Sequence, residues 1–223
     1  MLRRLRHETR AHQCVADADA LTLIARPPKP EAYREFLFKL YGFEAPFEDA
    51  FAAVTELAGW IDMSCRRKSA LLIADLVQMG MSLERSLEIP YCRIARFETP
   101  QKALAWMYVV SKNVTTQQLL HGHLARRAPA LELATAYLSA HDNLAVDPWI
   151  ELGKALDHFA EQPDEADAIV EGALEAYDRQ HEWLNPVLPS ATAIRETYER
   201  ADQVRHEASR ALANADRLLR RLA

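Results

Sequence analysis

Histidines are the residues of this 223-residue chain best suited to bind a metal or to move protons. His121 and His123 are two positions apart, which on a helix turns their side chains about 200° from each other, so we do not expect them to share a metal ion. Asp178 and His181 have the i, i+3 spacing of carboxylate–histidine metal sites in helical bundles, but the sequence contains no second copy of this pair. His181 also continues the apolar row of its helix, which favours a hydrogen-bonded histidine in the core.

Patterns typical of the common enzyme classes are absent from the sequence. It has no glycine-rich phosphate loop, no Gly-x-Ser-x-Gly, no Cys-x-x-Cys and no His-Glu-x-x-His. The three cysteines are widely spaced and no apolar segment precedes the first helix, so we expect a reduced, cytoplasmic protein. No apolar run approaches the roughly 18 residues of a membrane span, and basic residues alternate with acidic ones at a net charge of −5, so neither a membrane nor nucleic acid is an expected partner.

The composition predicts an all-α fold. Hydrophobic residues make up 49% of the chain, enough for a buried core. Six glycines stand where average usage would give about 16, and this scarcity disfavours sandwiches, barrels and glycine-loop nucleotide folds.

Prolines and apolar periodicity divide the chain into predicted helices. The first ends near residues 24–26, before three prolines. The others are expected over 31–41, from Pro46 to Trp60, over 69–81, over 101–127 as one long element, over 148–160, over 164–184 and over 192–222. Residues 88–99 are expected to form a loop.

The order of several motifs resembles the bacterial heme oxygenases, especially those associated with phytochromes. The resemblance covers residues 1–185 and lies in an ordered series: Leu5-Arg6-His7-Glu8-Thr9-Arg10-Ala11-His12-Gln13, Tyr33-Arg34-Glu35-Phe36-Leu37, Leu40-Tyr41-Gly42-Phe43-Glu44-Ala45-Pro46, Arg67-Lys68, Ala74-Asp75-Leu76 and Ala103-Leu104-Ala105-Trp106-Met107-Tyr108-Val109. It implies a single-domain helical bundle that holds heme between a proximal first helix and a kinked distal helix, and that opens heme to biliverdin. Residues 186–223, with an amphipathic final helix, lie outside it.

The proximal motif departs from the family pattern. The family places its axial histidine four residues after a threonine, which from Thr9 is position 13, and here that residue is Gln13. Glutamine is a poor iron ligand compared with a neutral imidazole. The alternative ligand is His12, one position or about 100° around the helix.

The distal motif departs as well, because three family glycines are replaced in the run Val109-Val110-Ser111-Lys112-Asn113-Val114-Thr115-Thr116-Gln117-Gln118. Glycine there permits a kink and lets the backbone lie over the heme. Lys112, Thr116 and Gln117 instead carry side chains toward the place of the ligand, so we expect a narrowed pocket and a straighter helix. Ser111 and Asn113 remain as polar groups of the distal helix.

These departures lead to the hypothesis of a degenerate heme oxygenase homologue without turnover, which needs no cofactor and has a binding or regulatory role. Its expected contact surfaces are the acid-rich stretch 131–178 and the 192–222 helix, through which it would bind a protein partner or dimerise. The first alternative is an active heme oxygenase, with heme as cofactor and His12 or His181 as axial ligand. A second is a pocket for another hydrophobic ligand.

Overall fold

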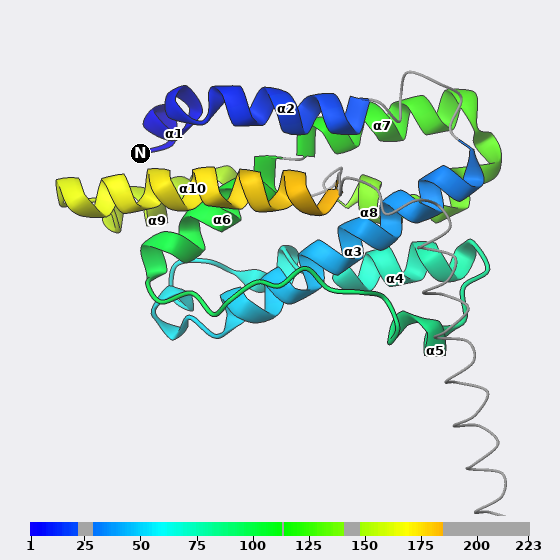
Figure 1. Ribbon diagram of the computed structural model, residues 1–223, viewed down its shortest axis with the longest axis horizontal. Helices are drawn as coiled ribbons and strands as arrows, with labels where there is room; N and C mark the ends of the chain where they lie inside the picture. Colours follow the sequence, from blue (N-terminus) through cyan, green and yellow to red (C-terminus); the bar gives the residue numbers. More distant parts are fainter. Residues whose placement is uncertain (22–28, 113, 141–147, 185–223) are drawn as a thin grey trace, which may run out of the picture. The chain divides into compact units, whose positions relative to one another are not determined.

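A helix in the middle of the molecule has no face toward water. In this computed structural model every residue from Ala103 to Val110 of α6 (Pro100–Lys112) is buried. Figure 1 shows α6 beside α10 (Pro163–Leu184). The structure describes residues 1–21, 29–112, 114–140 and 148–184. The helices of this part are α1 Leu2–Glu8, α2 Arg10–Leu21, α3 Pro30–Ala52, α4 Ser69–Gln78, α5 Leu83–Ser86, α6 Pro100–Lys112, α7 Val114–Arg127, α8 Ala136–Ser139, α9 Pro148–His158 and α10 Pro163–Leu184, with short 3-10 helices at Thr55–Leu57, Met63–Cys65 and Pro129–Ala134. No strand occurs among these residues, so the predicted all-α fold is confirmed.

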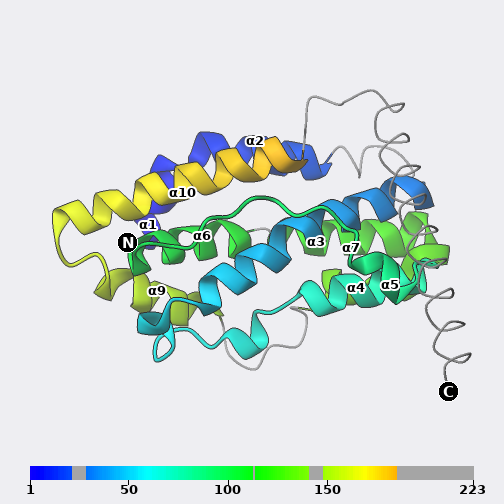
Figure 2. The same ribbon diagram turned by 60° about the horizontal axis from the view of Figure 1, so that its bottom comes forward.

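The first hydrophobic cluster surrounds α6. Helix α10 lies along it, and the absence of a side chain at Gly172 permits the contact, because a Cβ atom there would lie 3.0 Å from the Cβ of Ala105. The carboxyl half of α3 contributes Phe43 and Phe47, and Phe43 stacks on Trp106. Figure 2 shows α9 beside α6, at the end of the helix bundle where α1 also lies.

A second hydrophobic cluster lies at the other end of α3. It joins the amino half of that helix, with Tyr33 and Leu37, to α4, α7 and α8. Leu40 belongs to this second cluster and Phe43 to the first, so the middle of α3 is the place where the two clusters meet.

A proline inside α3 anchors the long loop over residues 87–99. Pro46 has no N–H, so it cannot bond the carbonyl of Gly42 four residues earlier. That carbonyl instead accepts a hydrogen bond from the Cys92 N–H at 2.7 Å. Gly42 also lacks the Cβ atom that would lie 2.4 Å from the carbonyl oxygen of Pro90. The loop therefore crosses α3 where two residues make room for it.

The prediction that Pro46 begins a new helix is wrong, because α3 continues through it to Ala52. The hydrogen bond from Cys92 offsets the bond that proline removes, and burial of both halves of α3 holds the helix together. Leu57 and Trp60, expected in that second helix, lie in and just after a 3-10 turn.

The other predicted helices have mixed outcomes. Those over 69–81, 148–160 and 164–184, and the loop over 88–99, are confirmed with small shifts at their ends. The predicted helix 101–127 corresponds to α6 and α7 on either side of position 113, which lies outside the described residues, so the straightness of this element stays a prediction. The end of the first helix near 24–26 and the helix 192–222 also lie outside the described residues.

The expectation that His181 is a core histidine is wrong. Its side chain is exposed on α10, whereas Tyr177 and Gln180 on the same helix are buried. The buried face of α10 passes through Gln180, so the neighbouring His181 points to the surface. The next apolar side chain of this helix is that of Trp183, whose indole N–H donates to the carbonyl of Lys39 at 2.7 Å.

We expect Gly42→Ala to lower the free energy of unfolding by about 2 kcal/mol, because the new methyl group collides with the backbone of Pro90 and must displace the loop. Urea denaturation measures this change. Gly122→Ala in α7 is the matched control, since its Cβ atom would meet nothing closer than 3.7 Å, and it should stabilise the protein by up to about 1 kcal/mol. Equal effects of both variants would contradict the close approach at Gly42.

Candidate functional site

The proximal residues lie on α2, which packs against α10 and α7. Gln13 is half-buried there. The Nε2 atom of His12 lies 3.4 Å from a carboxylate oxygen of Asp178 on α10, and the imidazole also faces the ring of Tyr177 at 6.5 Å. Its other nitrogen, Nδ1, is buried and has no hydrogen-bond partner in the described part of the chain.

Lys112 ends α6 close to the proximal helices. Its ammonium nitrogen lies 5.6 Å from the ring centre of Trp149 and 6.0 Å from that of Tyr108, which is within the range of a cation–π interaction. Partial burial lowers the pKa of Lys112, and nearby Arg6 lowers it further, while Asp17 on α2 raises it. A cation thus lies at the end of α6, against α9 and within electrostatic reach of Arg6 and Asp17.

The other distal residues do not share one place. Ser111 lines a cavity of about 50 Å³ next to α3. Gln117 is buried and donates through Nε2 to the hydroxyl of Tyr137 at 2.6 Å. Asn113 lies outside the described residues, and the side chain of Thr116 is not described.

A cluster of buried polar residues fills the junction of the two hydrophobic clusters. Its members come from α3, from the segment before α4, from α7 and from α8: Glu44, Glu48, Lys68, Gln117 and Tyr137. The Tyr137 hydroxyl donates to Glu44 and accepts from Gln117, so three side chains form a continuous chain of hydrogen bonds.

Glu48 begins helix α4 from outside that helix. Its Oε1 atom accepts hydrogen bonds from the backbone N–H groups of Lys68 at 2.6 Å and Ser69 at 2.9 Å. These N–H groups have no partner inside α4, and a negative charge at a helix amino terminus is favourable. Asp75 does the same for α8 by accepting from Ala136 and Tyr137.

Burial changes the charge state of this buried polar cluster. It raises the pKa of Glu44 to about 7, although Lys68 and the hydrogen bond from Tyr137 act to lower it. Burial also lowers the pKa of Lys68, against the attraction of Glu44 and Glu48. Both shifts favour the neutral forms, so a proton on Glu44 is exchangeable near neutral pH.

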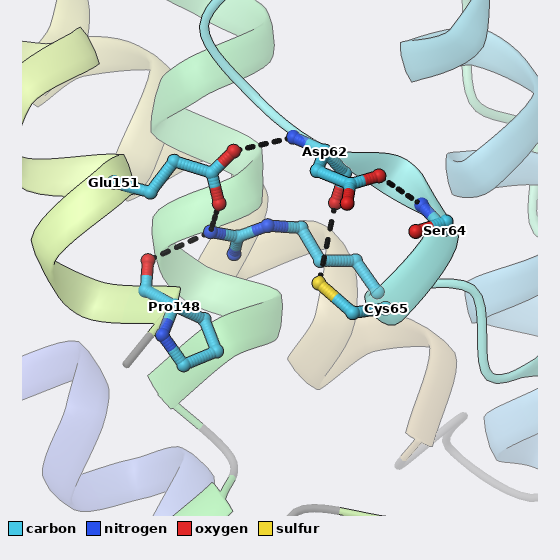
Figure 3. Close-up of polar contacts among 6 residues, drawn as sticks. Asp62, Ser64, Cys65, Pro148 and Glu151 are labelled. Atoms are coloured by element: carbon cyan, nitrogen blue, oxygen red, sulfur yellow. Dashed lines mark hydrogen bonds and ion pairs between the residues drawn. The ribbon is translucent and has the colours of Figure 1, made fainter. Parts of the chain in front are cut away.

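An ion pair holds α9 against the segment that carries Lys68. The Arg66 guanidinium donates through Nη2 to the Pro148 carbonyl at 2.7 Å and to Glu151 Oε2 at 3.0 Å. The other oxygen of Glu151 accepts from the Asp62 N–H, and Asp62 in turn accepts from Ser64 (Figure 3). This network fixes one wall of the cavity.

Sequence reasoning missed the buried polar cluster, although one signal was available. Glu44 and Glu48 continue the row of Leu37 and Leu40 at helical spacing, so they lie on the buried face of α3. A carboxylate in an apolar row must find partners or stay protonated. The partners Lys68 and Tyr137 come from distant segments, and no local pattern announces them.

No group of three or more His, Cys, Asp or Glu side chains among the described residues could hold a metal ion. No helix in this part is both long enough and apolar enough to cross a membrane.

The residues at the proximal position do not fit a heme. Gln13 offers an amide in place of an imidazole, and the Nε2 atom of His12 faces the carboxylate of Asp178 while its Nδ1 atom is buried. Lys112 adds a cation at the end of α6, against the ring of Trp149. Comparisons of the chain with protein-family models, with curated proteins and with solved structures give no match.

We expect Glu151→Ala to reduce the free energy of unfolding by about 2–3 kcal/mol, because it leaves the mostly buried charge of Arg66 without its partner. Glu182→Ala is the control: it removes an exposed pair with Arg179 and should cost at most about 0.5 kcal/mol. Thermal and urea unfolding of both variants measure the difference, and similar losses would contradict the role of Arg66 as a buried anchor.

The raised pKa of Glu44 predicts a pH dependence of stability. Between its ordinary value of 4.5 and about 7, the native protein holds this proton more tightly than the unfolded chain does. The free energy of unfolding should therefore fall as pH rises through this window, by up to about 3 kcal/mol. Glu44→Gln should remove this dependence, and exposed Glu56→Gln should keep it. Urea titrations at about pH 5 and about pH 8 measure it, and an unchanged slope in Glu44→Gln would refute the assignment.

Proposed function

We propose that this chain is a helical protein of heme oxygenase type that does not degrade heme and acts by binding a ligand or a protein partner. The proposal rests on the ordered motifs of residues 1–185 together with the changes at the proximal and distal positions. Turnover by this type of protein requires an axial imidazole and a distal wall that leaves room for oxygen on the iron. Gln13 at the proximal position and Lys112 at the distal position meet neither requirement.

The position of Lys112 is the observation that carries the proposal. Its ammonium packs on the rings of Tyr108 and Trp149 and has Arg6 and Asp17 in its electrostatic environment. A lysine held in this way opposes entry of a flat apolar macrocycle, because the ammonium would have to give up these contacts and stay desolvated.

An acidic surface supports a role in binding. Within 131–178 the described acidic side chains are exposed, with half-buried Glu151 and Glu165 as exceptions. Most of them lie on α9 and α10, where Asp157, Asp167 and Glu175 hold ion pairs with basic groups at the edge of the surface. A basic partner is the chemistry this surface fits best. The alternative contact, through the 192–222 helix, stays a hypothesis from the sequence.

One observation favours the second candidate, an active heme oxygenase with His12 as axial ligand. The buried Nδ1 atom of His12 has no hydrogen-bond partner in the described part of the chain, and a buried polar atom of this kind is costly. Ligation through this imidazole would require rotation of its ring away from Asp178.

A titration with hemin distinguishes the two candidates. We expect the wild-type protein to give no saturable Soret band and no biliverdin when ascorbate is added in air. The double variant Gln13→His, Lys112→Ala restores the imidazole and removes the cation, and it should bind hemin at least about tenfold more tightly than the wild type.

Two further variants serve as controls for this titration. Lys154→Ala removes an exposed lysine on α9 and should leave hemin binding unchanged. His12→Ala tests the second candidate: a saturable Soret band in the wild type that disappears in this variant would overturn the proposal. A band that persists in it would overturn both the proposal and the assignment of His12.

A further inference from the structure

We propose that Lys68 captures a small aldehyde or ketone as a Schiff base in the cavity beside α3. This activity is separate from the proposed function, since the cavity lies on the α3 side of α6 and its chemistry requires neither heme nor the acidic surface.

The cavity has a polar end and an apolar end. It measures about 50 Å³, and since one water needs about 10–15 Å³ it can hold several waters or one small organic molecule. Glu44, Glu48 and Lys68 line the polar end, and Met107, Val110 and Trp149 are among the apolar lining residues.

Lys68 is buried without a direct partner for its ammonium group. The residue is 4% exposed. Its backbone N–H is bonded to Glu48, but its Nζ atom makes no hydrogen bond or ion pair with the described residues, and its contact is with the ring of Tyr137 at 5.6 Å. Because Lys68 lines the cavity, its amine is accessible to a small molecule that enters there.

The surroundings favour the neutral amine, which is the nucleophilic form of lysine. Burial lowers the pKa of Lys68 and the charge of Arg66 acts in the same direction, while Glu44 and Glu48 oppose them. Protonation of Glu44 weakens that opposition, and this carboxyl group holds its proton up to about pH 7.

The chemistry balances without an added oxidant or reductant. The Nζ lone pair attacks the carbonyl carbon, and the carbonyl oxygen takes a proton from Glu44 to give a carbinolamine. Glu44 recovers a proton from the nitrogen and delivers it to the hydroxyl group, which leaves as water. The iminium nitrogen then returns its remaining proton to Glu44, so the products are an imine of Lys68 and one water molecule, and Glu44 ends in the protonation state in which it began.

The same groups define the class of ligand. Two carboxyl groups at the polar end disfavour an anion, although Lys68 is a cation when protonated. The small volume excludes aromatic and sugar aldehydes, and the apolar lining suits a short alkyl group. A neutral aldehyde or ketone of about two to four carbons therefore fits best.

Reductive trapping on the full-length protein tests this inference. Wild-type protein is incubated with limiting propionaldehyde and cyanoborohydride, and peptide mass mapping follows each lysine over time. We expect Lys68 to be alkylated at least about tenfold faster than exposed Lys154, because its surroundings favour the neutral amine and Glu44 provides the proton transfer. Labelling of Lys68 no faster than Lys154 would overturn the proposal and leave a cavity that holds water only.

Two further arms separate capture in the cavity from opening of the fold. Benzaldehyde should label Lys154 and spare Lys68, whereas labelling of both at similar rates would show that Lys68 reacts only when the protein unfolds locally. Glu44→Gln should slow the labelling of Lys68 at least about tenfold while Lys154 is unchanged. An unchanged rate at Lys68 in this variant would overturn the role of Glu44 in proton transfer.

Discussion

Helix α6 has no surface facing water between Ala103 and Val110, so each of its sides must be covered by another element. Helix α10 covers one side closely, because Gly172 carries no side chain. The carboxyl half of α3 and the helices α1 and α9 cover the others. The positions of the proximal helices, of the cavity and of Lys112 all follow from this arrangement, since each is defined by its contact with one side or the end of α6.

Buried charge is concentrated where the two hydrophobic clusters meet. Glu48 and Asp75 use their charges to satisfy the backbone at the starts of α4 and α8, so these carboxylates have a structural explanation. The side chains of Glu44 and Lys68 have no such explanation, because neither bonds the backbone at the start of a helix and both groups have pKa values moved toward the neutral form. A pair of this kind beside a cavity is more typical of a site than of a scaffold.

Local sequence patterns were sufficient for the helices whose apolar face is regular, such as α4, α9 and α10. They failed at Pro46, because a proline ends a helix only when nothing compensates for its missing N–H, and the compensating Cys92 is distant in sequence. They failed at His181 because the buried face of α10 passes through the neighbouring Gln180 instead. The proximal and distal residues could be named from the motifs. The place of Ser111 at the cavity, the contact of Lys112 with Trp149 and the whole buried polar cluster depend on segments that are distant in sequence, so no local pattern contains them.

The crossing of α3 by the 87–99 loop depends on positions 42 and 46 together, so we expect these two positions to change together in evolution. Proline at 46 releases a carbonyl, and glycine at 42 lets the loop reach it. An ancestor with an ordinary residue at 46 would have had that carbonyl bonded within the helix and would have gained nothing from the loop amide. Among descendants that keep this crossing, the two positions should therefore be retained together, and lineages that lose one should soon lose the other and change the length of the loop.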